Sequence, residues 1–146
     1  MLPGVTAPRP RLFLLLDRAA HAVRQRLERH ARDRLGVTMA QVGAVFYIAS
    51  RDGCLQKELA DALGIQPAAV TGLVDRMAAA GLVQRRPCPE DGRAQRLHLT
   101  AAGRRIAARA VPGVAAMQAA LTTGFSDDEL AVVQRFLEAA IARELT

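Results

Sequence analysis

The sequence predicts a mainly α-helical protein with one small β-hairpin, and two observations indicate this class. Apolar residues recur at helical spacing along most of the 146 residues, 51% of which are hydrophobic. Between Leu82 and Thr100 the apolar period changes to two, as in a strand that is buried on one face. A chain of this length and composition is large enough to hold a core without disulfides or metals.

The stretch from Leu55 to Met77 predicts two short helices joined by a tight turn at Gly64-Ile65. Glycine adopts the positive φ that ends a helix, and Pro67 suits the first position of the next helix because no N–H is needed there. The expected buried positions are Leu55, Leu59, Ala62 and Leu63 in the first helix, and Val70, Leu73, Val74 and Met77 in the second. This spacing is typical of a helix-turn-helix, although it also fits an ordinary helical hairpin.

The face of the second helix that stays outside is small and polar. Such a face fits the major groove of DNA, which is about 12 Å wide, and brings side chains to the base edges. We expect the DNA contacts on this helix to be Gln66, Ala68, Ala69, Thr71, Gly72 and Arg76.

A charged hairpin follows directly. We expect strands at 82–86 and 94–100, separated by the turn formers and charges of 87–93. A helix-turn-helix followed by such a hairpin is a winged helix. The predicted wing tip is 90–93, from which Arg93 is placed to enter a minor groove.

Basic residues complete the predicted DNA surface. The formal net charge of +6 favours a polyanionic partner. Lys57 and Arg85 are expected to contact phosphates, and Arg96 is a further expected DNA contact. With four Phe, one Tyr and no Trp, the chain has few rings on which single-stranded bases could stack, so the predicted partner is double-stranded DNA.

Long helices flank this lobe. A helix over 11–35 is expected to end at Gly36, and Thr38 with Gln41 predicts a capping box for the next helix. That second helix should stop near Asp52-Gly53. Its expected buried side is Val42, Val45, Phe46 and Ala49.

The C-terminal part predicts two more helices. Thr100 caps the first, which Pro112-Gly113 is expected to bend or interrupt. The capping box 126–129 starts the last helix. Its expected apolar stripe is Leu130, Val133, Leu137, Ala140 and Ile141, with Phe136 at the edge. Because the terminal helices have more apolar surface than a winged helix covers, we expect a second copy of the chain to cover the rest.

The expected organisation is therefore a mobile arm at 1–10 and one domain at 11–146. Within it, 11–35 and 101–146 form a dimerisation bundle, and 38–100 form the DNA-binding lobe.

Other classes of function find little support. The sequence has no phosphate loop and no nucleophile elbow, so we predict no enzyme and no cofactor. We also predict no metal site, because the sequence has no HExxH and no paired Cys, and its histidines are scattered at His21, His30 and His98. No apolar run approaches the roughly 18 residues of a membrane span, and we expect a cytoplasmic protein. Cys54 and Cys88 are interpreted as a semi-buried filler and an incidental loop residue, with oxidant sensing as the alternative.

Several motifs, in order, resemble the MarR family of bacterial winged helix-turn-helix regulators, from Arg11 to Leu145. They are the segments 56–60, 70–76, 81–85, 91–93 and 99–103. The resemblance implies a homodimer that binds a pseudo-palindromic operator and is often released by a small phenolic or other anionic ligand. Compared with the family, Leu55 stands in place of a hydroxyl cap and Gly92 in place of a second wing Arg. The N-terminal helix also lacks the cysteine of the peroxide-sensing branch.

The predicted function is thus a ligand-responsive transcriptional repressor. We expect a cleft between the terminal helices and the winged helix to bind an anionic aromatic ligand through Phe13, Arg18, Phe46 and Tyr47. The alternative is a winged helix that docks an acidic protein partner.

Overall fold

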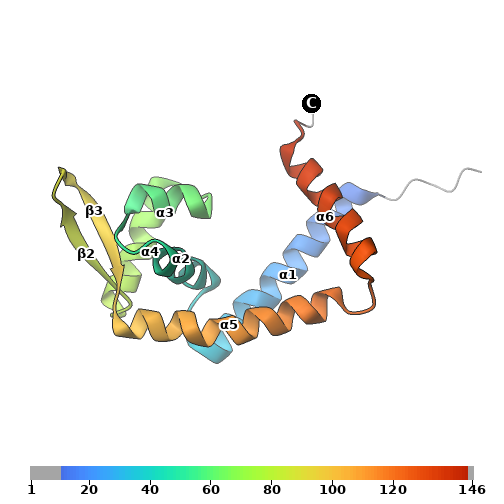
Figure 1. The fold of residues 1–146 in the computed structure, drawn as a ribbon, viewed down its shortest axis with the longest axis horizontal. Coiled ribbons are helices and arrows are strands. Elements are labelled where there is room, and N and C mark those ends of the chain that lie inside the picture. The colour runs from blue at the N-terminus through green and yellow to red at the C-terminus, as the bar shows by residue number, and fades with distance from the viewer. Residues whose placement is uncertain (1–10, 145–146) are drawn as a thin grey trace, which may run out of the picture. The chain divides into compact units, whose positions relative to one another are not determined.

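The computed structural model describes residues 11–144, which form six helices and a three-stranded sheet (Figure 1). The predicted mainly α-helical winged-helix class is confirmed. The predicted arm at 1–10 lies outside the described residues. The elements are α1 (Leu12–Leu35), α2 (Met39–Ser50), β1 (Cys54–Leu55), α3 (Gln56–Leu63), α4 (Pro67–Ala79), β2 (Val83–Cys88), β3 (Asp91–Leu99), α5 (Ala101–Thr122) and α6 (Asp127–Ala142).

The chain divides into two compact units, with the division between Ala110 and Val111 inside α5. The first unit holds α1 to α4, the sheet and the first half of α5. The second holds the remainder of α5 and α6. The predicted functional boundaries at 35, 38 and 100 stay predictions.

Local signals explain the connection between α1 and α2. Gly36 ends α1 with φ 69°, and the predicted capping box is present: the Gln41 N–H donates to Thr38 Oγ1 at 3.2 Å and the Thr38 N–H donates to Gln41 Oε1 at 2.9 Å. The Glu28 carboxylate of α1 also accepts from the Met39 N–H at 3.0 Å. This contact lowers the pKa of Glu28, since the hydrogen bond favours the charged carboxylate.

Two predicted core positions are wrong. Ala49 is exposed, and the buried face of α2 is instead formed by Val42, Ala44, Val45 and Ile48. Ala62 is also exposed, because α3 packs through Leu59 and Ala60. In both helices the apolar residues cover a wider arc than the face that packs against the core. Alanine is small enough to lie on either the buried or the exposed side.

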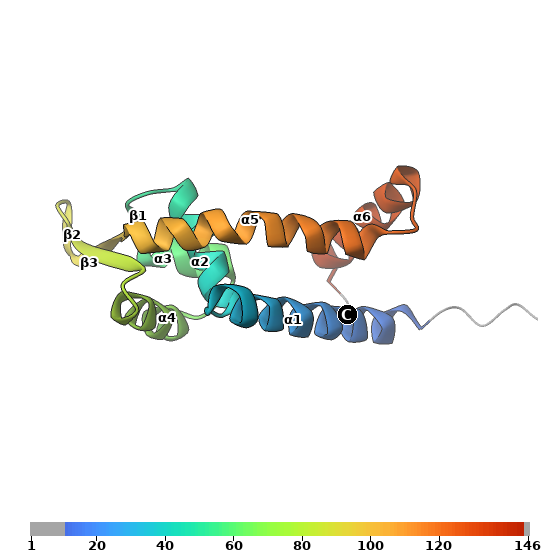
Figure 2. The ribbon, with the colours of Figure 1, turned by 90° about the horizontal axis from the view of Figure 1, so that it is seen from below.

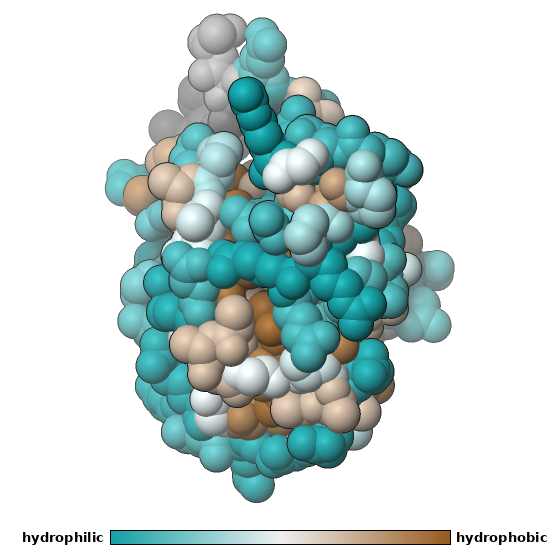
Figure 3. Space-filling model, turned by 90° about the vertical axis from the view of Figure 1, so that its left-hand side faces the viewer, coloured by the Kyte–Doolittle hydropathy of each residue, from teal (hydrophilic) through white to brown (hydrophobic). Residues whose placement is uncertain are grey.

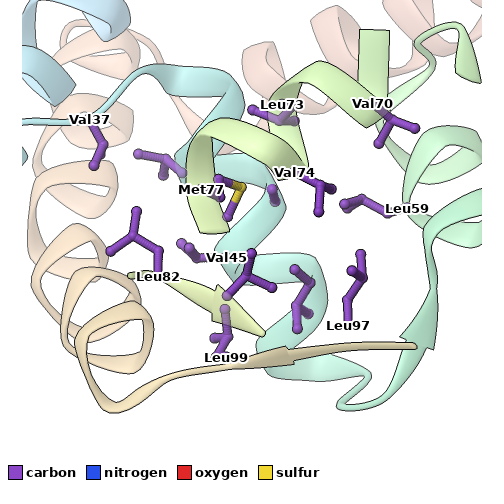
Figure 4. Close-up of a cluster of buried hydrophobic side chains, with 14 of the residues drawn as sticks. Val37, Val45, Leu59, Val70, Leu73, Val74, Met77, Leu82, Leu97 and Leu99 are labelled. Atoms are coloured by element: carbon purple, nitrogen blue, oxygen red, sulfur yellow. The ribbon is translucent and has the colours of Figure 1, made fainter. Parts of the chain in front are cut away.

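The helix-turn-helix itself is as expected. Gly64 ends α3 in the left-handed region with φ 63°, and Pro67 begins α4. The buried side chains of α4 are Val70, Leu73, Val74 and Met77, and they meet Leu59, Leu97 and Leu99 in one core cluster (Figure 4). This core holds α4 by its apolar face and leaves the other face outside.

The sheet has the order β1-β3-β2, and both of its pairings are antiparallel. The wing strands are longer than predicted, so the tip is the turn at Pro89-Glu90 and not 90–93. Arg93 accordingly lies within β3. The short strand β1 was not predicted; its Cys54 pairs with Leu97 and fastens the base of the wing to the start of α3.

In the second unit, α5 continues through Pro112, so the predicted interruption is wrong. The predicted start of α6 is confirmed: the Glu129 N–H donates to Ser126 Oγ at 3.2 Å and the Ser126 N–H donates to Glu129 Oε2 at 2.8 Å. Not one of the described residues from Val111 to Glu144 is buried. Among the helices described, none combines the length and apolar character of a membrane span.

Candidate nucleic-acid interface

The outer face of α4 is available to a ligand along its whole length. Gln66, Ala68, Ala69, Thr71 and Arg76 are exposed, and Gly72 is half-buried. The predicted groove-contacting residues therefore share one face of one helix. The wing strands β2 and β3 stand beside this helix in the same unit (Figure 2).

Thr71 is fixed by two hydrogen bonds. Its hydroxyl donates to the Pro67 carbonyl at 3.0 Å and accepts from Gln56 Nε2 at 2.9 Å. Gln56 is the first residue of α3, so this contact ties the beginning of α3 to the exposed face of α4. Gln56 was not among the predicted site residues, since its partner lies 15 residues further along the chain.

Two arginine side chains contact residues of α4, one near Gly72 and the other at Asp75. The guanidinium of Arg76 lies over Gly72, where an added Cβ would come within 3.2 Å of its Nη1. Arg85, on β2, is half-buried and forms an ion pair with Asp75 of α4. Arg85 thus connects the wing to α4, and any phosphate contact by it would have to share this guanidinium with Asp75.

The start of α3 compensates for the missing hydroxyl cap. Leu55 has no side-chain acceptor, but Glu58 Oε2 accepts from the Leu55 N–H at 2.7 Å. A carboxylate in the first turn also interacts favourably with the helix dipole. Lys57 is exposed in the same turn, and within residues 11–144 it has no ion-pair partner.

The wing holds arginines on both strands. The Arg93 side chain is exposed and, in the described part of the chain, unpaired with any acid. Arg96 is half-buried; it donates to the Gly53 carbonyl at 2.9 Å and contacts Glu90 at 3.4 Å. Arg96 therefore braces the wing against the loop before β1. Arg86 on β2 is exposed and was missed, although its place in the predicted strand could have indicated it.

The end of the molecule that carries the wing is covered mainly by hydrophilic residues (Figure 3). Small apolar patches lie between them. A polar, arginine-bearing surface is suited to phosphates and base edges, since phosphate contacts dominate affinity and base contacts give specificity.

The predicted ligand residues are not gathered into one site within the first unit. Phe13 is 74% exposed and Arg18 is exposed in the first half of α1, whereas Phe46 and Tyr47 are half-buried against the core at α2. Figures 1 and 2 both show this half of α1 projecting away from α2. A hollow of about 550 Å³ lies elsewhere, along the second half of α1, lined by Arg24, Gln25, Glu28, Arg29, Arg32 and Asp33.

Both cysteines are buried, which corrects the interpretation of Cys88 as a loop residue: it ends β2. Burial raises the pKa of the Cys54 thiol to about 11, with a further contribution from the Glu58 carboxylate. A buried protonated thiol is a poor nucleophile, which disfavours oxidant sensing at Cys54. In the described residues, no three His, Cys, Asp or Glu side chains come together as metal ligands would.

Residues 35–94, which span the helix-turn-helix and most of the wing, match the model of the MarR family. Over this segment the chain is similar to the MarR family. The MarR-family regulator Sco3205 of Streptomyces coelicolor, solved in complex with DNA, has a TM-score of 0.85 at 22% identity, over 97% of this chain and 90% of that one. A mutant MarR of E. coli with operator DNA has a TM-score of 0.76 at 25% identity, over 92% and 99%.

BpsR of Bordetella bronchiseptica, whose DNA binding is regulated by 6-hydroxynicotinic acid, has a TM-score of 0.82 at 21% identity, over 97% of this chain and 100% of that one. No curated protein sequence matches the chain. The resemblance inferred from the ordered motifs is thus confirmed for the family and the fold.

Proposed function

We propose that this MarR-family protein is a transcriptional repressor that binds a pseudo-palindromic DNA operator as a homodimer. The observation that carries the proposal is the division of α4 into two faces. Val70, Leu73, Val74 and Met77 are buried in the core, while Thr71, Arg76 and their neighbours stay outside, next to an arginine-bearing wing. A helix in the major groove with a wing beside it uses both surfaces.

Support for a homodimer comes from the second unit. Its helix α6 has an apolar stripe, yet Val133 and Leu137 are 45% and 39% exposed and no described residue of the unit is buried. A stripe of this kind in water is unfavourable, and a second copy of the chain would cover it by symmetry. In the first turn of α1, Leu12, Phe13, Leu14 and Leu15 are exposed as well.

Regulation by a small molecule is the finer part of the proposal. The relative BpsR responds to an aromatic carboxylic acid, and an anion of this kind would suit Arg18 with Phe13, Phe46 and Tyr47. Since one chain does not bring these residues together, a site that uses them all would require the partner's residues. Such a ligand weakens DNA binding when it favours a dimer spacing that does not fit two grooves.

The test is selection of bound fragments from random or genomic DNA, followed by titration of the selected operator and a scrambled duplex at several salt concentrations. A repressor of this type should select two half-sites about one helical turn, roughly 10 bp, apart, and its affinity should fall steeply with salt. Binding that is weak, without periodicity and insensitive to salt would instead favour the docking of an acidic protein. Adding benzoate-like compounds to the complex then tests for release at millimolar ligand.

A further inference from the structure

The Thr71 hydroxyl lies on the exposed face of α4, and its hydrogen bonds restrict what it can still do. A hydroxyl has one proton and two lone pairs. The proton is donated to the Pro67 carbonyl, and one lone pair accepts from Gln56 Nε2. One lone pair is left, on a residue that is exposed. The residue is therefore held as an acceptor.

The same count of donors and acceptors fixes the orientation of the Gln56 side-chain amide. Since the Thr71 proton is already given to Pro67, the group of Gln56 that faces Thr71 must be the NH₂ and not the carbonyl oxygen. Gln56 also affects the rotamer of Thr71. In a helix, threonine divides between two χ1 rotamers, and the hydrogen bond from Gln56 favours the rotamer that keeps the Thr71 hydroxyl at this position.

We infer that Gln56 is a positioning residue for base recognition, and that it makes Thr71 select an exocyclic amino group in the major groove. The amino groups there are N4 of cytosine and N6 of adenine; the keto oxygens of guanine and thymine offer only acceptors. An acceptor facing a keto oxygen forms no hydrogen bond, whereas an acceptor facing an amine does. This inference rests on the proposed DNA-binding function and deepens it.

The surroundings of Thr71 agree with this role. The Arg76 guanidinium, which lies over Gly72, supplies donors on the same face. Donors from Arg76 beside an acceptor from Thr71 would distinguish the two members of a base pair by hydrogen-bond polarity. Gln56 does not need to touch DNA for this purpose, because it acts through Thr71.

The experiment uses the full-length protein and the selected operator. Each cytosine and adenine of one half-site is replaced in turn by pyrimidin-2-one or purine, which lack the exocyclic amine. For the wild type we expect one position at which this replacement weakens binding about tenfold, the fold-change of a good hydrogen bond. The Thr71→Val variant should lose this sensitivity at that position.

The decisive variants are Gln56→Met, which keeps length and helix propensity but cannot donate, and Gln56→Ala. In both variants, removal of the amine at that position should weaken operator binding only about two- to threefold. Both should bind scrambled DNA as the wild type does. The double variant Gln56→Met with Thr71→Val should behave as Thr71→Val alone, because Gln56 acts only through the hydroxyl. Gln25→Ala, an exposed glutamine of α1, is the matched control and should keep the tenfold loss.

Two results would overturn the inference and leave the proposed function standing: a wild type that binds its operator specifically but has no Thr71-dependent sensitivity to amine removal, or Gln56 variants that keep the full tenfold loss. If the wild type bound operator and scrambled DNA equally well, the proposed function would fail and the inference with it. Thermal unfolding of each variant shows whether a loss of binding is a loss of fold.

Discussion

At the scale of single residues, Gly103 in the first turn of α5 lies tightly against the backbone of Leu82. A Cβ at this position would lie 2.1 Å from the Leu82 carbonyl oxygen, which accepts from the Thr100 N–H at 3.1 Å. The family motif 99–103 thus has a physical reason for its glycine. The helix begins against the backbone that leads into β2, and no side chain fits between them.

We therefore expect Gly103→Ala to destabilise the protein by about 1–3 kcal/mol, the usual cost of overpacking where backbone must move. The measurement is chemical denaturation of the variant and the wild type. Gly92→Ala is the matched control, because an added Cβ there meets nothing within 4 Å and its φ is not positive. Equal stability of the two variants would mean that the backbone at Leu82 and the start of α5 can move apart at little cost.

At the scale of helices and strands, short-range signals were sufficient to predict caps. Thr38 with Gln41 and Ser126 with Glu129 were predicted because each partner is three residues away and the bonding pattern is set by the backbone. The strand β1 was missed because Cys54 pairs with Leu97, 43 positions later, and two residues carry no period. For the same reason the sequence showed Thr71 on an outer face but not that Gln56 holds it.

The link from α1 to α2 depends on Glu28, which accepts from the Met39 N–H at the start of α2 and from Arg32 Nε at 2.7 Å. We expect Glu28→Ala to cost about 1 kcal/mol of stability at neutral pH. Because folding lowers the pKa of Glu28, its contribution is present at neutral pH and is lost as the pH falls through that lowered pKa. Urea denaturation at pH 7 and pH 3 measures this difference.

A matched control for that experiment is Glu138→Ala, whose carboxylate accepts from Gln134 on the surface of α6. It should change stability little at either pH. If Glu28→Ala remained as destabilising at pH 3 as at pH 7, the effect would come from packing and not from the charged cap.

The wing gives a prediction about DNA contacts. Arg93 is exposed on β3, so Arg93→Ala should weaken operator binding by about 1–3 kcal/mol per subunit and reduce a preference for A·T-rich flanks, where narrow minor grooves attract arginine. Lys57→Ala should instead weaken all sequences alike and lower the salt slope by about one. Operator and scrambled duplexes titrated at several salt concentrations separate the two effects.

The neighbouring position offers a gain of function. At Gly92 there is open space for a side chain, so Gly92→Arg should restore the second wing arginine of the family and tighten binding without loss of stability. An Arg93→Ala variant with full affinity and an unchanged flank preference would show that the wing does not enter the minor groove.

At the scale of the whole molecule, one helix crosses between two units of different character. The first unit has its own core, which α4 and the sheet complete, whereas the second has an apolar stripe and no buried residue among those described. The helical spacing of apolar residues predicted the apolar faces of both units equally well. It could not tell which stripe the chain itself covers, because that depends on tertiary packing.

The last prediction follows from this difference. Val133→Arg and Leu137→Arg place a charge in the stripe of α6, and either should convert a dimer to a monomer, because an interface with an unpaired buried charge is strongly disfavoured. Since two half-sites are bound together only by a linked pair of lobes, operator affinity should fall by roughly 10²-fold or more. Sedimentation equilibrium and operator titration measure the two effects.

Ala131→Arg, exposed on another side of the same helix, adds the same charge and should leave both the mass and the affinity unchanged. A monomeric wild type would refute the assembly, and a dimer that survives both stripe variants would place its interface away from α6.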